Sequence, residues 1–200
     1  QGYLEALHDG IVLPTQETLE LLQEEALRLT HLVEDLLKLA RADAAKANLL
    51  LEDVNISVLT LRILRSFELN LAKKLIRVQT ELDEKSHTLA DRDKITQVIE
   101  NLIKNALQYT PEGGTVFVRV QKSNGKITFA IENNGPGIDP SDLPLIFERF
   151  YRGEKSRSRD YGGTGIGLTI VKELVEAHGG KVEVKSTPVE TVFSFALPTR

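Results

Sequence analysis

Cysteine, methionine and tryptophan are absent from the 200 residues of this chain. Without cysteine there are no disulfides, no zinc clusters with thiolate ligands and no cysteine nucleophile, and the composition is compatible with a reducing compartment. No apolar run approaches the roughly 18 residues of a membrane-spanning helix, and no signal peptide opens the chain. Because Gln1 stands in place of an initiator methionine, we expect a piece of a longer protein whose remainder can hold membrane spans.

Basic residues are slightly fewer than acidic residues in this chain. The chain has 25 Lys and Arg against 29 Asp and Glu, a formal net charge of −4. This balance disfavours a nucleic-acid partner recognised through general charge. The 41% of hydrophobic residues suffices for a core of ordinary size, and the length suits one large domain or a smaller one with an extra element.

The first 46 residues have the pattern of a helical hairpin. Leu4, Leu7 and Ile11 share one helical face, and a Pro-Thr pair at 14–15 interrupts it. A regular heptad seam follows, with Leu19, Leu22, Ala26, Leu29, Val33, Leu36 and Ala40 at alternating steps of three and four. Such a seam needs a partner, which is a longer first helix, a second chain, or both. The alternative is a plain hairpin packed on the domain that follows.

Residues 47–200 alternate helical and strand patterns. Helical spacing covers 57–72, the stretch from Asp91, a possible N-cap, to Leu107, and 167–177. Strand patterns cover 76–82, 116–120, 127–131, 182–184 and 193–197, with a Ser-Asn-Gly turn at 123–125. Antiparallel neighbours with helices between them predict an α+β fold, a two-layer α/β sandwich with its helices on one sheet face.

Three segments carry residues that do not serve packing. Asn101 and Asn105 share one helical face, and an amide oxygen suits Mg²⁺ that already has phosphate ligands. Residues 133–138 read Asn-Asn-Gly-Pro-Gly-Ile at the end of a strand, where glycines let a ligand approach the backbone. Residues 162–168 read Gly-Gly-Thr-Gly-Ile-Gly-Leu before a helix, whose N–H groups favour phosphate. Taken singly, the asparagines are equally typical of a solvated face and the glycines of turns.

The familiar phosphate-binding loops are excluded by spacing. Leu168 stands where a G-x-G-x-x-G fingerprint requires glycine, no Walker A G-K-[ST] occurs, and the protein-kinase motifs H-R-D and D-F-G are absent. Between the two glycine segments lie cations interleaved with aromatic residues, namely Arg149, Arg152, Lys155, Arg157 and Arg159. They suit a lid that closes on phosphates. A solvated loop and a nucleic-acid patch are the alternatives.

In this order, the segments resemble those of the bacterial sensor histidine kinases. More widely, they resemble the Bergerat ATP-binding fold shared with type II topoisomerases, a heat-shock chaperone family and mismatch-repair ATPases. Residues 97–106 look like the N box, 133–137 like the first glycine box, 147–152 like the F box and 163–168 like the second glycine box. The hairpin at 1–46 is similar to the family's dimerisation domain, and 47–200 to its catalytic domain.

The resemblance implies a site for ATP and Mg²⁺, in which Asn101, Asn105 and Arg152 are catalytic and Asn105 is the Mg²⁺ ligand. The ATP-binding residues that it implies are Asn101, Asn105, Tyr109, Asn133, Gly135, Gly137, Ile138, Tyr151, Arg152, Gly163, Thr164, Gly165, Ile166, Gly167, Leu168 and Thr191. It further implies a cytoplasmic kinase that forms a homodimer through the hairpin and sits at a membrane only through segments outside this chain. Its phosphoryl group would pass from ATP to a histidine and then to an aspartate of a response regulator.

Three features depart from the family's pattern. Asn133 stands where an aspartate usually reads the adenine amino group, and Gln108 where a lysine or arginine often reaches the phosphates. The phosphoacceptor is missing, because no histidine has the family's motif around it; we interpret all four as structural or solvent-facing, namely His8, His31, His87 and His178. The alternatives are a docking module whose nucleotide site has decayed, and an ATP-gated conformational ATPase of the same fold.

Overall fold

The computed structural model describes residues 10, 15–45, 48–151, 153 and 165–199. Its contacts divide the chain into two units, Gln1–Leu37 and Lys38–Arg200, a division that falls within helix α2 (Gln16–Ala45). The predicted boundary between residues 46 and 47 follows the end of that helix and stays a prediction. The predicted helix at 4–11 lies outside the described residues, apart from Gly10.

Helix α2 confirms the helix predicted over the heptad seam. Thr15 caps its start, since the Thr15 hydroxyl accepts a hydrogen bond from the Thr18 N–H at 3.2 Å. Along the predicted seam, Leu19, Leu29 and Val33 are 55%, 60% and 57% exposed. This helix therefore presents a row of large apolar side chains to solvent, a surface of the kind that a partner helix covers.

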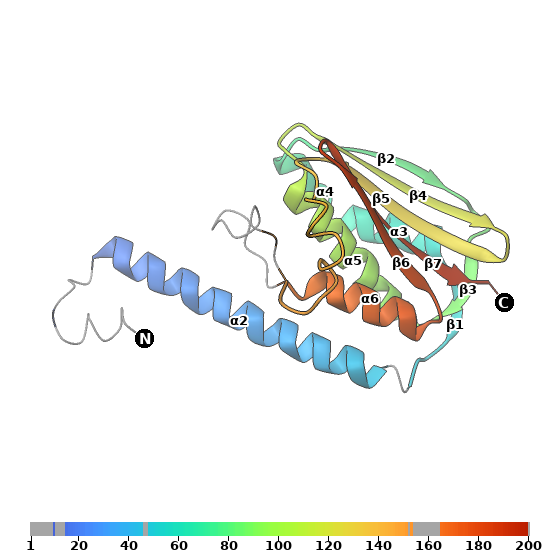
Figure 1. Ribbon diagram of the computed structural model, residues 1–200, viewed down its shortest axis with the longest axis horizontal. Helices are drawn as coiled ribbons and strands as arrows, with labels where there is room; N and C mark the ends of the chain where they lie inside the picture. The colour runs from blue at the N-terminus through green and yellow to red at the C-terminus, as the bar shows by residue number, and fades with distance from the viewer. Residues whose placement is uncertain (1–9, 11–14, 46–47, 152, 154–164, 200) are drawn as a thin grey trace. The chain divides into compact units, whose positions relative to one another are not determined.

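The second unit alternates short strands with helices, as Figure 1 shows. In chain order its elements are β1 (Glu52–Asn55), α3 (Ile56–Ser66), α4 (Glu68–Lys73), β2 (Arg77–Leu82), β3 (His87–Ala90), α5 (Arg92–Tyr109), β4 (Thr115–Ser123), β5 (Lys126–Asn134), α6 (Gly167–Ala177), β6 (Lys181–Thr187) and β7 (Glu190–Pro198).

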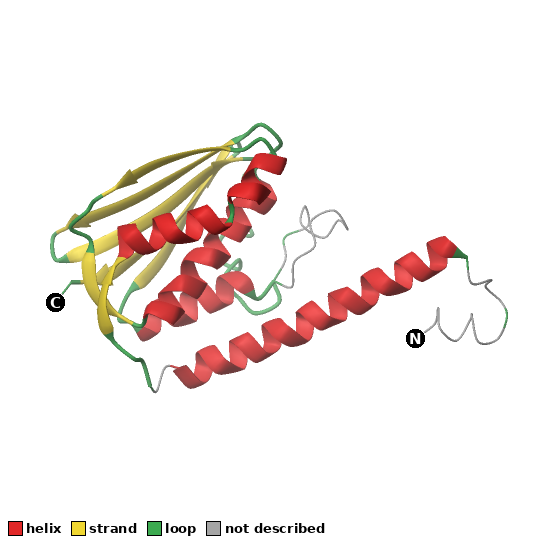
Figure 2. Cartoon of the chain, turned by 180° about the vertical axis from the view of Figure 1, so that it is seen from behind, coloured by secondary structure: helices red, strands yellow, loops and turns green. Residues whose placement is uncertain are grey.

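Five of these strands form one sheet in the order β2-β4-β5-β7-β6, and β1 pairs with β3 in a separate ribbon. Strands β2 and β4 run parallel, and the other neighbours in the large sheet run antiparallel. Helices α3, α5 and α6 lie on one face of that sheet (Figure 2). The predicted two-layer α/β sandwich is confirmed.

The core lies between these two layers and follows the alternation of the strands. Val118 pairs with Ile131 and Val120 with Phe129, and all four side chains are at most 1% exposed. Phe129 stacks on Phe195 of β7 at a centroid distance of 5.1 Å. At the β4–β5 turn, residues 124 and 125 both have positive φ, the conformation that an Asn-Gly hairpin turn requires.

Two local details differ from the sequence-based expectation. The predicted helix over 57–72 is broken at Phe67, whose N–H bonds to the Leu64 carbonyl three residues back, so that the turn tightens and α4 starts afresh. The ribbon of β1 and β3 was not predicted. Its strands have four residues each, too short for a period-two pattern to show, and their pairing joins segments more than thirty residues apart.

Candidate functional site

The two asparagines of α5 lie on the face that meets the start of α6. Asp91 caps α5, as predicted, by accepting hydrogen bonds from the N–H groups of Asp93 and Lys94. Asn101 is half-buried and donates from Nδ2 to the Gly167 carbonyl at 3.3 Å. The N-box helix therefore contacts Gly167 of the second glycine segment, sixty-six residues away in sequence.

Asn105 differs from Asn101 in having an uncommitted side chain. Asn105 is half-buried, one turn further along α5, and its side chain makes no hydrogen bond within the part of the chain that the structure describes. A neutral amide oxygen held on a rigid helix is a fitting ligand for Mg²⁺ whose other ligands are phosphate oxygens and water. The residues present thus fit the ion that the family resemblance implies.

The first glycine segment packs on backbone from two directions. A Cβ on Gly135 would lie 2.7 Å from the Tyr109 carbonyl, so the end of α5 touches this loop. A Cβ on Gly137, where φ is +63°, would lie 2.1 Å from the Thr187 carbonyl at the β6–β7 turn. Both glycines are therefore required by close backbone approach, whatever they contribute to ligand binding.

The predicted adenine-reading pair lies side by side at the ends of two neighbouring strands. Asn133 of β5 is directly opposite Thr191 of β7, and their side chains are 3% and 6% exposed. The Asn133 amide nitrogen donates to the Asn134 carbonyl at 3.4 Å. The side-chain carbonyl of Asn133 is thus available as an acceptor for an exocyclic amino group.

Sequence reasoning missed Ser186, which ties Thr191 to the loop. The Ser186 hydroxyl lies 2.7 Å from the Thr191 hydroxyl and accepts a hydrogen bond from the Ile138 N–H at 2.9 Å. Residues 186 and 191 are opposite each other in the β6–β7 register. The signal in the sequence was a serine on the half-buried face of β6, where Val182 and Val184 precede it.

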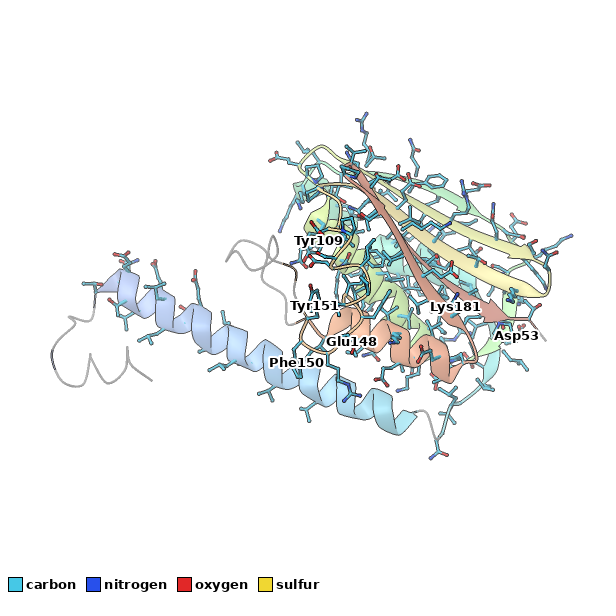
Figure 3. All side chains as sticks on the ribbon, in the orientation of Figure 1. Asp53, Tyr109, Glu148, Phe150, Tyr151 and Lys181 are labelled. Carbon is cyan, nitrogen blue, oxygen red and sulfur yellow. The ribbon has the colours of Figure 1, made fainter. Side chains whose placement is uncertain are left out.

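Around the second glycine segment, backbone rather than side chains forms the contact with the F box. A Cβ on Gly165, where φ is +74°, would lie 2.8 Å from the Tyr151 carbonyl and 2.9 Å from the Phe150 carbonyl carbon. The Tyr151 hydroxyl donates to the Asp142 carboxylate at 2.6 Å. Figure 3 shows Tyr109 and Tyr151 on the side of the helix layer where α5 ends and α6 begins.

Other predicted site residues divide into buried ones and ones outside the described residues. Ile166 is fully buried and belongs to the hydrophobic core, whereas Leu168 is half-buried beside it. The predicted lid cation Arg152 and the predicted phosphate-loop residues Gly163 and Thr164 lie outside the described residues.

A second residue that the sequence did not reveal is Lys74, which holds the end of α5. Its ammonium donates to the carbonyls of Leu107 and Gln108 at 2.8 and 3.1 Å. The last turn of α5 contains no basic residue of its own, so Lys74 supplies the cation that complements the negative end of the helix dipole. Partial burial lowers the pKa of the Lys74 ammonium below its usual value.

We expect Lys74→Met to lower the free energy of unfolding by about 1 kcal/mol, because two charge-assisted hydrogen bonds are lost while the aliphatic stem remains. The matched control is Lys73→Met, since Lys73 is the sequence neighbour and is exposed. Urea unfolding followed by circular dichroism measures both. Equal effects for the two variants would contradict the role given to Lys74.

Comparison with known proteins decides among the branches of this fold. Residues 90–200 match the family described as "Histidine kinase-, DNA gyrase B-, and HSP90-like ATPase". The chain belongs to this ATPase family. Its curated relatives include the sensor histidine kinase WalK of Bacillus subtilis, 36% identical over 99% of this chain and 33% of the relative. The histidine-protein kinase BaeS of Escherichia coli is 34% identical over 94% and 40%, respectively.

Solved structures of histidine kinases have the same fold. The histidine kinase AdeS of Acinetobacter baumannii matches with a TM-score of 0.76 at 25% identity, over 100% of this chain and 93% of that one. A full-length ShkA structure in complex with AMPPNP matches with a TM-score of 0.75 at 28% identity, over 94% and 39%. The chain therefore contains the catalytic domain of a sensor histidine kinase, a domain whose family implies ATP binding.

The chain spans less than half the length of these curated relatives, 33% of WalK and 40% of BaeS. Among the helices that the structure describes, none combines the length and apolar character of a membrane span.

Proposed function

We propose that this kinase domain transfers the γ-phosphoryl group of ATP to a histidine on a dimerisation helix, from which it passes to an aspartate of a response regulator. The observation that carries the proposal is the contact between Asn101 and Gly167, which brings the N-box helix to the N-terminus of α6. The Asn105 side chain is available as a Mg²⁺ ligand, and the N-terminus of α6, which begins at Gly167, can receive phosphate oxygens. Together they are suited to a Mg²⁺-bound triphosphate.

The chain's own residues would bind and orient the nucleotide. Backbone N–H groups at the start of α6 would receive phosphate oxygens, and Asn133 with Thr191 would hold the adenine edge. Asn105 would hold Mg²⁺, which supplies charge neutralisation on the phosphates when bound. A histidine imidazole would then form the N–P bond as the bond from the γ-phosphorus to the ADP oxygen breaks. The main contribution of the protein to this step is to position the reacting groups.

The proposed partners follow from α2 and from the relatives. The exposed seam of α2, including Leu19, Leu29 and Val33, supports a homodimer formed through the hairpin at residues 1–46. A structure of the histidine kinase ThkA in complex with the response regulator TrrA has the same fold, with a TM-score of 0.74 at 23% identity. We propose that the downstream partner of this chain is the receiver domain of a response regulator. We also propose that segments outside this chain anchor the protein to a membrane.

Phosphotransfer to a separately supplied substrate tests the proposal. The chain is mixed with γ-labelled ATP, Mg²⁺ and the histidine-containing hairpin of Bacillus subtilis WalK, and the hairpin is assayed for acid-labile phosphate. Label on the hairpin that requires the chain supports the kinase. The absence of label on this hairpin and on one from another relative contradicts the kinase, and if nucleotide binding is absent as well, the docking module is supported instead.

Asn133 leads to a prediction on adenine recognition. We expect Asn133→Asp to lower the dissociation constant for ATP by roughly tenfold and to leave that for GTP unchanged, because a charged acceptor strengthens the hydrogen bond to the amino group. Its matched control is Asn134→Asp, since Asn134 is exposed and its side chain instead accepts from the Thr115 N–H at 2.7 Å. Competition with a fluorescent nucleotide measures all three proteins; a change shared by both variants would indicate a general charge effect.

A further inference from the structure

The half-buried imidazole of His178 connects the two helices of the site at the end opposite the glycine segment. His178 is the C-cap of α6, and its Nδ1 donates to the Leu174 carbonyl at 2.7 Å. Its Nε2 lies 3.0 Å from the backbone nitrogen of Asp91, at the start of α5. A carbonyl only accepts and a backbone N–H only donates, so Nδ1 acts as the donor and Nε2 as the acceptor.

Asp91 is itself a junction of three segments. Its carboxylate is 6% exposed and accepts the N–H groups of Asp93 and Lys94 in α5, each at 3.1 Å. The second carboxylate oxygen accepts from the Leu50 N–H, also at 3.1 Å, in the segment that follows α2. The backbone N–H of Asp91 then joins this junction to His178.

Helix α6 is therefore hydrogen-bonded to α5 at both of its ends. Asn101 bonds to Gly167 at the start of α6, and Asp91 bonds to His178 at its end. The ten residues from 91 to 101 and the eleven from 167 to 178 each span about 15–17 Å of helix, so the ties match an antiparallel pair. Asn105 lies one turn beyond the first tie, and its distance from the glycine segment depends on how α6 is held.

Neither helix needs His178 in order to end properly. The carboxylate of Asp91 already caps α5. Helix α6 ends in a Schellman arrangement, in which the Gly179 N–H bonds to the Glu176 carbonyl and the Gly180 N–H to the Val175 carbonyl. Through Nδ1 the imidazole bonds within the last turn of α6, and through Nε2 it connects α6 to α5.

We propose that His178 is a positioning residue for the nucleotide site, which sets the placement of α6 against α5 and so of Gly165 and Gly167 against Asn105. The proposal rests on the proposed function, since it concerns the same site. Loss of the imidazole bonds leaves both helices folded but releases one of the two ties that fix their relative position. The consequence is weaker binding of the Mg²⁺–ATP complex by a domain that remains native.

The test compares three variants of the whole chain. His178→Phe keeps a ring but removes both hydrogen bonds, His178→Gln restores an acceptor and a donor, and His87→Phe is the control on β3, where the imidazole is exposed and bonds to Asp53 and Asn55. Competition with a fluorescent nucleotide gives the dissociation constant for ATP with and without Mg²⁺. Each variant is measured at a temperature where circular dichroism shows it to be folded.

We expect His178→Phe to weaken Mg²⁺–ATP binding roughly tenfold, His178→Gln to recover part of that loss, and His87→Phe to bind as the wild type does. If thermal unfolding shifts while binding by the folded His178 variants is unchanged, the residue is only structural and the inference is wrong. A wild-type imidazole with its proton on Nε2, seen by nitrogen NMR, also overturns it. No binding by the wild type contradicts the proposed function as well.

Discussion

Asn105→Ala is expected to reduce phosphotransfer from Mg²⁺–ATP by at least about a hundredfold, with little change in stability. The reason for the first effect is that the substitution removes the protein ligand that we assign to Mg²⁺, and preorganised charge stabilisation of this kind is worth roughly 10²–10³ in rate. The reason for the second is that the Asn105 side chain makes no hydrogen bond within the described part of the chain. Label transfer to a separate hairpin and thermal unfolding measure the two effects.

Two further variants on α5 separate metal binding from helix packing. Thr96→Ala is the control, because Thr96 is half-buried and its hydroxyl bonds to the local Arg92 carbonyl at 2.8 Å; phosphotransfer should be unchanged. Asn101→Ala removes the bond to the Gly167 carbonyl, so it should affect both stability and nucleotide binding. An Asn105→Ala protein that keeps both the Mg²⁺ dependence of ATP binding and full phosphotransfer would contradict the assignment.

Gly137→Ala should have the largest effect on folding, a loss of about 2–5 kcal/mol of unfolding free energy. Two costs combine there. An alanine at φ +63° carries about 1–2 kcal/mol of left-handed backbone strain. Its Cβ would also lie 2.1 Å from the Thr187 carbonyl, and relief of such overpacking by backbone movement costs about 1–3 kcal/mol more.

Gly113→Ala provides the matched comparison for Gly137. Gly113 has φ +73° but nothing within 4 Å of the position that a Cβ would take. Only the backbone strain applies, and we expect a loss of about 1 kcal/mol. Urea denaturation of both variants measures the difference between them. Similar losses would show that the contact with Thr187 relaxes at little cost.

Local signals explain why much of the fold and the site could be predicted from the sequence. Helix α5 could be predicted from Asp91 as a capping residue and from apolar residues at helical spacing. The structure buries six of these apolar residues, namely Ile95, Val98, Ile99, Leu102, Ile103 and Ala106. The β4–β5 hairpin is specified by alternating apolar residues around an Asn-Gly turn. The asparagines and glycines were found because short-range spacing brings them to one helix face or one helix start.

The residues that were missed act across long sequence separations. His178 was interpreted as structural or solvent-facing, and its bond to Asp91 spans 87 residues. Lys74 reaches carbonyls 33 and 34 residues away, and Ser186 contributes through a register that only the formed sheet defines. A lysine or a serine in such a stretch has the pattern of an ordinary surface residue until tertiary packing selects its partner.

Calorimetric titration of ATP into the intact chain, with and without Mg²⁺, tests the central claim most directly. The account predicts Mg²⁺-dependent binding with a dissociation constant on the order of 1–100 µM, weakened in Asn105→Ala. The absence of binding heat, together with a failure of ATP to displace a fluorescent nucleotide, would contradict the account. Asn133 and Gln108 would then mark a pocket that no longer holds ATP, and the chain would be a docking module.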